Sequence, residues 1–298
     1  MRSSYGTPIL SSTTAATSSL RRHRSQKNFR RSNVRFQCFA SGSSGNCVYI
    51  GSETTHILID TGISRKKTME CLQNLGLSLA DLSAIFITHE HSDHIGGLPM
   101  IEKTRPIPVY ASKGTIRALL KMPQFANTDA EVFHEIEADG KVRVGDLLIS
   151  PMKIKHDAAD PFAYRVWYGQ QKVSVCTDLG CFDAYTVECL KHSDVLLLEA
   201  NHDVRMLQLG HYPYPLKQRI LGDFGHLSND SCAKLLSEVL DSHMQAVFLG
   251  HLSKDNNMPE IAYETVRLSM LSGDGIYREK QFPLYVAKRD VPSELIEF

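Results

Sequence analysis

Short apolar runs alternate with longer amphipathic stretches along most of the chain. Runs rich in Val, Ile, Leu and Phe predict β-strands, whereas apolar residues spaced three or four apart predict helices. The runs lie at 47–50, 56–59, 84–88, 107–110, 146–155, 163–168, 172–177, 194–199, 246–249 and 284–287. The helical patterns lie at 66–75, 113–121, 183–191, 229–240 and 259–268, the fourth opening on Asn229 or Asp230 as an N-cap. This order predicts an α/β protein in which two sheets have helices outside them.

The N-terminal segment has a different composition. Residues 1–52 contain eight Lys or Arg and no Asp or Glu, and Ser and Thr are frequent in them. They lack the apolar stretch of a secretory signal, and they contain too few apolar residues to fold alone. We therefore expect residues 1–38 to be a disordered transit peptide for the chloroplast, with the mitochondrion as the alternative destination. A retained basic tail that binds nucleic acid is the other interpretation.

The remaining chain is typical of a globular protein. Residues 39–298 are enough for one domain with a sizeable core. No apolar run approaches the roughly 18 to 20 residues that cross a bilayer, so we expect no membrane-spanning segment. The seven cysteines form no CxxC pair and mostly lie in apolar segments, which predicts buried thiols. Beyond residue 52 the chain carries 25 Lys and Arg against 33 Asp and Glu, so it is acidic.

The densest group of chemically active side chains follows the apolar run 84–88. It is His89-Glu-His91-Ser-Asp93-His94-Ile-Gly-Gly, with three His and one Asp in six residues. A strand that ends here places His89 and His91 on one side of the chain, and a turn into a helix brings Asp93 and His94 from the other side. The two glycines that follow allow close backbone approach. This pattern predicts a site for two metal ions.

At these residues the sequence resembles the metallo-β-lactamase superfamily, whose HxHxDH signature is matched at every position. The resemblance extends from about residue 39 to the C-terminus and implies a single-domain αββα sandwich of two mixed sheets. Four further motifs of the superfamily can be matched, each at the end of an apolar run, by Asp60, His156, Asp178 and His251. The resemblance implies that Asp60 orients the ligand loop without binding metal, and that the other three are metal ligands.

The resemblance leads to a specific division of the ligands between two divalent ions, Zn or Mn. We expect His89, His91 and His156 to hold one ion, and Asp93, His94 and His251 to hold the other. Asp178 would bridge both, and a hydroxide between the ions would be the nucleophile. His and carboxylate ligands suit zinc and manganese alike, so the sequence leaves the metal open.

Further motifs narrow the function within this broad superfamily. The segment after His156 departs from the GHTxGH pattern of the thioester and glyoxalase II-like branches. The runs 41–46, 88–94, 156–157, 199–203, 225–229 and 250–257 instead resemble the YycJ/WalJ family of metallo-hydrolases, which implies an exonuclease acting on a DNA or RNA end, DNA being favoured. A small-molecule thioester or ester hydrolase and a non-catalytic metal-binding protein are the alternatives. The oligomeric state remains open.

Two histidines share a Gly-His-Leu-Ser context, His226 and His251. His251 directly follows an apolar run and is the expected ligand. We expect His226, hydrogen-bonded to Glu199, to act beside Asp93 as a catalytic residue that donates a proton or stabilises developing charge; helix capping is the alternative. His202 and His211 remain open. No role is expected for His23, His56, His134, His192 and His243. The candidate substrate-binding cations are 65–67, Arg117 with Lys121, and 217–219.

Overall fold

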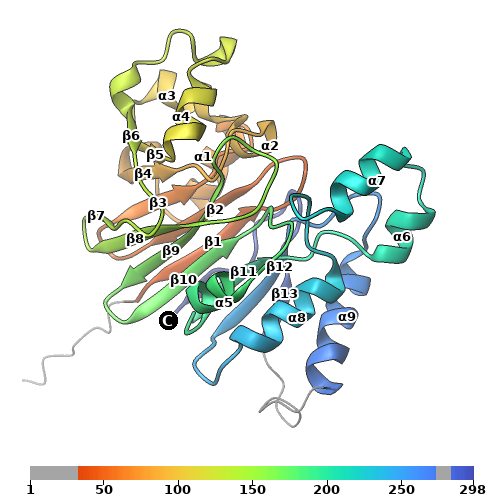
Figure 1. Ribbon diagram of the computed structural model, residues 1–298. Helices are drawn as coiled ribbons and strands as arrows, with labels where there is room; N and C mark the ends of the chain where they lie inside the picture. The colour runs from red at the N-terminus through yellow and green to blue at the C-terminus, as the bar shows by residue number, and fades with distance from the viewer. Residues whose placement is uncertain (1–32, 273–282) are drawn as a thin grey trace, which may run out of the picture. The chain divides into compact units, whose positions relative to one another are not determined.

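The computed structural model describes residues 33–272 and 283–298 (Figure 1). Residues 1–32 of the predicted leader lie outside the described residues, so its predicted disorder and targeting role stay predictions. The described residues form one compact unit with two seven-stranded sheets. Their helices include none that is long and apolar enough to cross a membrane.

The first sheet has the strand order β14-β1-β2-β3-β4-β5-β6. Its strands are β1 (Arg35–Ala40), β2 (Cys47–Gly51), β3 (His56–Ile59), β4 (Leu82–Phe86), β5 (Val109–Ala111), β6 (Phe133–Glu135) and β14 (Ile296–Glu297). β1, β2 and β3 pair antiparallel, whereas β3 to β6 run parallel. The carboxyl ends of β3 and β4 therefore lie at the same edge of the sheet.

The second sheet repeats this plan, with the order β13-β12-β11-β10-β9-β8-β7. Its strands are β7 (Val142–Val144), β8 (Leu147–Lys153), β9 (Phe162–Tyr168), β10 (Gln171–Cys176), β11 (Val195–Glu199), β12 (Ala246–Gly250) and β13 (Leu284–Val286). β7 to β10 pair antiparallel, and β10 to β13 run parallel. The carboxyl ends of β10, β11 and β12 are consequently neighbours.

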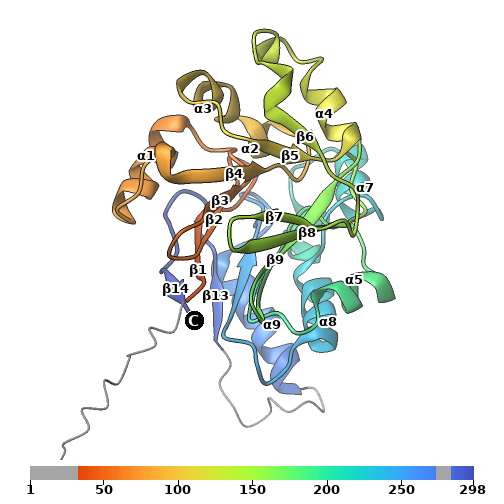
Figure 2. The ribbon, with the colours of Figure 1, turned by 90° about the vertical axis from the view of Figure 1, so that its left-hand side faces the viewer.

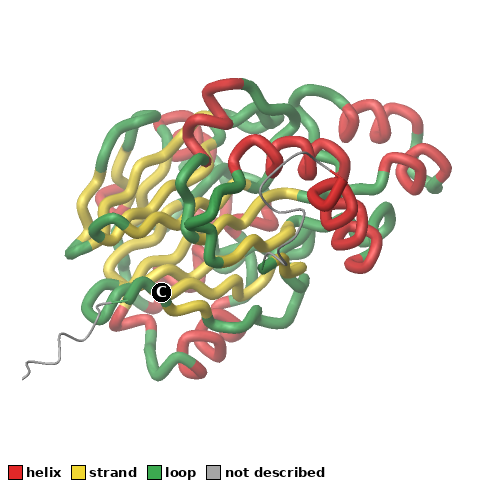
Figure 3. Tube along the Cα trace, turned by 90° about the horizontal axis from the view of Figure 1, so that it is seen from below, coloured by secondary structure: helices red, strands yellow, loops and turns green. Residues whose placement is uncertain are grey.

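Helices cover the outer faces of both sheets, and most of them lie outside the strands in Figures 2 and 3. The helices are α1 (Arg65–Asn74), α2 (Ser92–Ile95), α3 (Leu98–Thr104), α4 (Lys113–Leu119), α5 (Ala184–Leu190), α6 (Val204–Leu209), α7 (Tyr214–Leu221), α8 (Asn229–Val239) and α9 (Pro259–Ser272). Short 3-10 turns lie at Leu79–Asp81, Pro123–Phe125 and Ala130–Val132. α1, α3 and α4 pack on the first sheet, and α5, α8 and α9 on the second.

Three apolar layers result, one under each set of helices and one between the sheets. The middle layer joins Phe36, Phe86, Tyr164 and Phe248 from both sheets. Burying a large apolar side chain contributes about 1.5–3 kcal/mol to folding, so these layers hold the sheets together. The predicted αββα sandwich of two mixed sheets is confirmed. The cysteines among the described residues are free, and only Cys181 is not fully buried.

The structure differs from the sequence-based prediction at the N-terminal boundary. A domain beginning at residue 39 would divide β1, in which Phe36 and Cys38 are buried and Arg35 is paired with Gly51. Burial alternates over Arg35–Cys38, which is the pattern of a strand, and the folded region therefore begins before the predicted start.

Other differences concern short elements. β1, β6, β7 and β14 were not predicted as strands, nor α3, α6 and α7 as helices, because they are two to eight residues long and carry little periodicity. The turn into a helix that was expected at Asp93 and His94 is present as α2. The helix α8 is capped by Ser228, whose hydroxyl accepts from the backbone N–H of Ser231, and not by Asn229 or Asp230. Ser228 precedes the first helical residue, which is where a capping side chain can reach the free N–H groups.

Candidate metal centre

The predicted site residues gather where strands of both sheets end. Asp60 follows β3, Asp178 follows β10 after one intervening residue, and His251 follows β12 directly. All three have positive φ, 59° for Asp60 and Asp178 and 55° for His251. A left-handed backbone is uncommon for residues other than Gly, and such strain is typical of functional positions. The chain thus turns sharply at each strand end and directs a polar side chain into one place.

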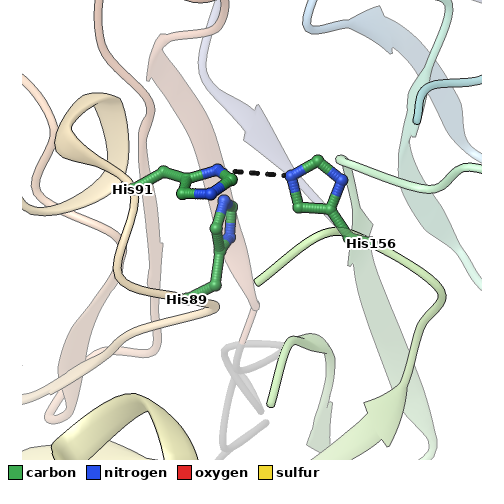
Figure 4. Close-up of side chains that lie close together, drawn as sticks. All are labelled: His89, His91 and His156. Atoms are coloured by element: carbon green, nitrogen blue, oxygen red, sulfur yellow. Dashed lines mark hydrogen bonds between the residues drawn. The ribbon is translucent and has the colours of Figure 1, made fainter. Parts of the chain in front are cut away.

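His89, His91 and His156 form the first cluster, which we call the three-histidine group (Figure 4). Nε2 of His156 lies 3.3 Å from Nδ1 of His91. The rings of His89 and His91 lie 4.5 Å apart between centroids. Nε2 of His89 is buried and has no hydrogen-bond partner in the described part of the chain. Three imidazole nitrogens therefore converge, as the ligands of one divalent ion do.

The outer nitrogens of this group contact neutral partners. Nδ1 of His89 lies 3.0 Å from the hydroxyl of Thr88, and Nδ1 of His156 lies 3.2 Å from the carbonyl of Gly225. Burial lowers the pKa of His89 and of His156, and the neighbouring carboxylate of Asp178 offsets this only in part. Both rings are therefore held neutral, with a lone pair on Nε2 for a metal ion.

Asp93, His94 and His251 form the second cluster, which we call the aspartate group. Oδ2 of Asp93 lies 3.5 Å from Nε2 of His94 and 3.5 Å from Nε2 of His251. Here the outer nitrogens contact buried carboxylates. Nδ1 of His94 lies 2.7 Å from Asp60, and Nδ1 of His251 lies 2.7 Å from Glu199. The position of Asp60 fits the predicted orienting role, because it holds the ring of His94 and leaves Nε2 directed at the cluster.

The charges around the aspartate group shift its pKa values in the opposite direction. Burial lowers the pKa of His94 and of His251, but the carboxylates around them outweigh it. Asp178 and Asp60 raise the pKa of His94 well above its ordinary value. Asp178, Asp93 and Glu199 raise the pKa of His251 to about 10.

Asp178 lies between the two groups. Its Oδ2 is 3.3 Å from Nε2 of His94, and its Oδ1 is 3.8 Å from Nε2 of His156. Burial raises the pKa of Asp178, but the cationic rings of His251 and His94 lower it well below its usual range. Oδ2 is buried, and although it lies at ion-pair distance from His94 it accepts no hydrogen bond of good geometry among the residues described. A buried carboxylate oxygen costs stability unless it is paired.

The donor atoms fit two divalent metal ions. Three buried polar atoms of the site lack a hydrogen-bond partner within the described ranges: Nε2 of His89, Nε2 of His251 and Oδ2 of Asp178. One belongs to the three-histidine group, one to the aspartate group and one to the residue between them. Imidazole and carboxylate ligands suit zinc and manganese. The structure brings together each ligand set that the sequence predicts, and the ligand roles themselves stay predictions.

Glu199 connects the aspartate group to His226. Its Oε1 lies 2.8 Å from Nδ1 of His226, which is the predicted contact, and also 2.7 Å from Nδ1 of His251. Its Oε2 accepts from the backbone N–H groups of Leu179 and Leu227. Burial raises the pKa of Glu199, but His226 and His251 lower it to about 2. The shared contact with His251 could not be inferred from the sequence.

The ring of His226 lies between the two groups. Its centroid is 5.1 Å from that of His156 and 5.2 Å from that of His251. Its side chain remains 17% exposed, more than that of either neighbour. His226 is therefore the histidine of this set that solvent reaches most easily. The predicted catalytic role of His226 stays a prediction.

Several residues outside the motif histidines also support the site. The side-chain amide of Asn46 lies 3.1 Å from Nε2 of His94 and 3.3 Å from Asp93. Glu90 accepts from the backbone N–H of Ala159 at 2.8 Å and so ties the loop of His89 to the loop of His156. A side chain at Gly62 would collide with the carbonyl of Asp93 at 1.7 Å. Asn46 lies in the motif run 41–46, but no pattern in the sequence indicates these contacts.

The other histidines lie outside the two ligand clusters. His202 is buried, neither ring nitrogen has a partner within the part of the chain described, and burial lowers its pKa to about 4. His211 packs edge-on against Tyr212. His56, His134 and His192 contact Tyr49, Tyr110 and Asp241 away from the clusters, and His23 lies outside the described residues. None of these belongs to the metal-ligand clusters of the described chain.

The predicted basic run 217–219 lies on helix α7. Neither α7 nor the preceding helix α6 was predicted from the sequence. Lys217 donates to the carbonyls of Gln208 and Gly210 at the end of α6. Arg219 pairs with Asp157, the residue after His156. Lys217 therefore links α7 to the end of α6, and Arg219 links α7 to the loop that carries His156.

Comparisons with known proteins show which family the chain resembles. A family model described as a β-lactamase superfamily domain matches residues 55–249, which include every predicted site residue except His251. The exodeoxyribonuclease YycJ of Bacillus anthracis is 33% identical over 263 residues, 88% of this chain and 98% of that protein. The exodeoxyribonuclease WalJ of Streptococcus pneumoniae is 34% identical over 263 residues, covering 88% and 97%.

A solved structure shows the same fold. It is YhfI from Bacillus subtilis, a metallo-β-lactamase fold protein, which matches with a TM-score of 0.66 at 15% identity and covers 90% of this chain and 100% of its own. At this level of identity the likeness concerns the fold alone.

Proposed function

The chain belongs to the metallo-β-lactamase superfamily and is a metal-dependent hydrolase, and we propose that it is an exonuclease that cleaves phosphodiester bonds in DNA. Two relatives named exodeoxyribonucleases resemble it over nearly their whole length. The supporting observation in the structure is the pair of ligand clusters with Asp178 between them. Two metal ions held by these neighbouring clusters would suit displacement at phosphorus, because each could neutralise oxygens on one side of the phosphate.

We assign the ligands to two of the overlapping groups that the structure brings together, the three-histidine group and the aspartate group. His89, His91 and His156 would hold one divalent ion, Asp93, His94 and His251 the other, with Asp178 contacting both. When bound, the ions supply Lewis acidity and make water a stronger nucleophile near neutral pH. The protein keeps the ligands in position through Asp60, Glu199, Thr88 and Gly225, each of which lies within hydrogen-bonding distance of at least one ligand ring.

His226 would move a proton in this reaction. Glu199 holds its Nδ1–H, which leaves Nε2 as the atom that can exchange a proton with substrate. A proton given to the leaving oxygen avoids expelling an alkoxide, and this kind of assistance accelerates reactions by about 10²–10⁴-fold.

A substrate panel tests the proposal. Purified protein loaded with Mn²⁺ or Zn²⁺ is given end-labelled DNA, end-labelled RNA, a thioester and a simple carboxylic ester. We expect metal-dependent release of mononucleotides from DNA at a higher rate than from RNA. Turnover of the thioester or ester without release of nucleotides would refute the nuclease assignment and favour the small-molecule hydrolase.

We also propose that the leader directs the protein to plastids, on the strength of its Ser, Thr and Arg content. A fluorescent reporter fused behind residues 1–38 should enter plastids, and retention of the fusion in the cytosol or entry into mitochondria would refute this. Because β1 begins at Arg35, processing should occur before Val34. A variant beginning at Ser32 should be stable and active, whereas one beginning at Phe39 should lose stability.

A further inference from the structure

A cavity borders the metal centre beside His251. It has a volume of about 490 Å³ and is lined by residues from three distant segments, among them Ser41, Leu252, Lys254, Lys288 and Arg289. Ser41 contacts the metal centre through a hydrogen bond, because its hydroxyl accepts from the backbone N–H of His251 at 2.8 Å. β12 and β13, which pair side by side, deliver the two segments that follow them to this place (Figure 1). A ligand in the cavity would therefore lie next to the metal ligand His251.

The lining carries three cations, Lys254, Lys288 and Arg289, against two acids, Glu260 and Asp290. None of the three cations forms an ion pair with a carboxylate among the residues that the structure describes. In contrast, Lys113, Lys153, Arg165 and Arg219 are each paired with a carboxylate. In a domain whose net charge is negative, a group of cations that lack a carboxylate partner among the described residues favours an anionic ligand at this cavity.

Arg289 is already held in a fixed position at this cavity. One of its terminal nitrogens donates to the carbonyl of Leu252 at 2.9 Å, and the other donates to the hydroxyl of Ser43 at 3.3 Å. A guanidinium has five N–H groups, so further donors remain for a ligand. Because the side chain is anchored at both nitrogens, little conformational entropy is lost when it binds. Guanidinium groups of this kind bind phosphate oxygens in pairs.

From these observations we propose that the cavity binds the terminal phosphate of the strand that is cleaved at the metals. A terminal phosphate carries up to two negative charges, whereas a phosphate inside the strand carries one, so a cluster of cations favours the end of the strand. Placed beside His251, it would let the enzyme select strand ends. The inference rests on the proposed nuclease function and adds how that site chooses its substrate.

The test compares DNA duplexes of one sequence that carry a 5′-phosphate, a 3′-phosphate or only hydroxyl ends. The proteins are the wild type, Arg289→Gln, Lys254→Gln, and Lys234→Gln as a control on the exposed face of α8. We expect the wild type and the control to cleave one phosphorylated duplex with a kcat/KM at least about 10-fold above that for hydroxyl ends. In Arg289→Gln this ratio should fall toward 1, mainly through KM, because a hydrogen bond to a charged group is lost.

The outcomes separate the two proposals. If the wild type prefers neither phosphorylated end, or if both cavity variants keep the full preference, the phosphate assignment is wrong although the enzyme is a nuclease. If the wild type hydrolyses bis(p-nitrophenyl) phosphate but no DNA, the proposed nuclease function itself is wrong. Arg289 also helps to hold its loop, so Lys254→Gln, whose side chain is exposed, decides the matter should Arg289→Gln fail to fold.

Discussion

The two ligand clusters differ in the groups that contact the outer nitrogens of their histidines. In the three-histidine group, His89 and His156 are bonded to a hydroxyl and a carbonyl, and their pKa values are lowered. In the aspartate group, His94 and His251 are bonded to the buried carboxylates of Asp60 and Glu199, and their pKa values are raised. A carboxylate behind an imidazole makes it a more basic ligand. The comparison indicates that metal binding in the aspartate group depends on charges outside the ligand set.

Removing the residue that both groups share should have the largest effect. Asp178→Ala takes away a carboxylate that contacts histidines of both clusters. We expect activity to fall by at least about 10³-fold and the metal content of the purified protein to drop for both ions. Elemental analysis together with nuclease assays measures this. Full activity in the metal-stripped variant would contradict the assignment.

Next in size is the contrast between His251 and His226, the two histidines that Glu199 holds. His251→Ala should lose one of two metal ions, because His251 belongs to the aspartate group. His226→Ala should keep about two ions per chain while turnover falls by about 10²–10⁴-fold. If instead His226→Ala loses an ion and His251→Ala does not, their roles are reversed.

A smaller effect is expected at Asp60, which binds no metal in this assignment. Asp60→Asn places an amide N–H or a weaker acceptor opposite Nδ1 of His94, so the ring loses its negatively charged partner. Metal affinity of the aspartate group should fall by about 10–100-fold, while the three-histidine group keeps its ion. Titration with Mn²⁺ followed by calorimetry measures both steps. Glu238→Gln, on the exposed face of α8, is the matched control, and equal weakening of both steps would show that the clusters do not differ as described.

The smallest predicted effect lies in the three-histidine group. Glu90→Ala removes the acceptor of the Ala159 N–H and so loosens the loop of His156 relative to that of His89. We expect metal affinity there to fall by roughly 3–10-fold, as the loss of one hydrogen bond implies. Glu90→Gln retains an acceptor oxygen and should bind metal almost as the wild type does. A weakening confined to the aspartate group would be the opposite of the expected result.

The sequence predicted the parts of the site that depend on residue type at a strand end. Asp60, His156, Asp178 and His251 were recognisable because each follows an apolar run. It could not predict the partners that come from segments distant in sequence. The carbonyl of Gly225 behind His156 and the cavity around Arg289 depend on how the two sheets meet, and no local pattern records that.

The same reasoning explains the errors in the prediction of the strands and helices. The paired strands with long apolar runs were found within a few residues, since burial on both faces requires such runs. Most of β1 was assigned to the leader because its residues follow a basic stretch without any break in composition. α7, with Pro213 before it and Pro215 at its start, lacked the length at which helical periodicity becomes visible.

The left-handed backbone at Asp60, Asp178 and His251 has a consequence for how such proteins change over evolutionary time. A residue with a side chain in this conformation makes the fold less stable than glycine would, by on the order of 1 kcal/mol at each position. Selection for heat resistance alone would therefore favour glycine at the three positions and would destroy the enzyme. A descendant of this chain that has lost its chemistry should be recognisable by glycines at these strand ends, before any other part of the fold has changed.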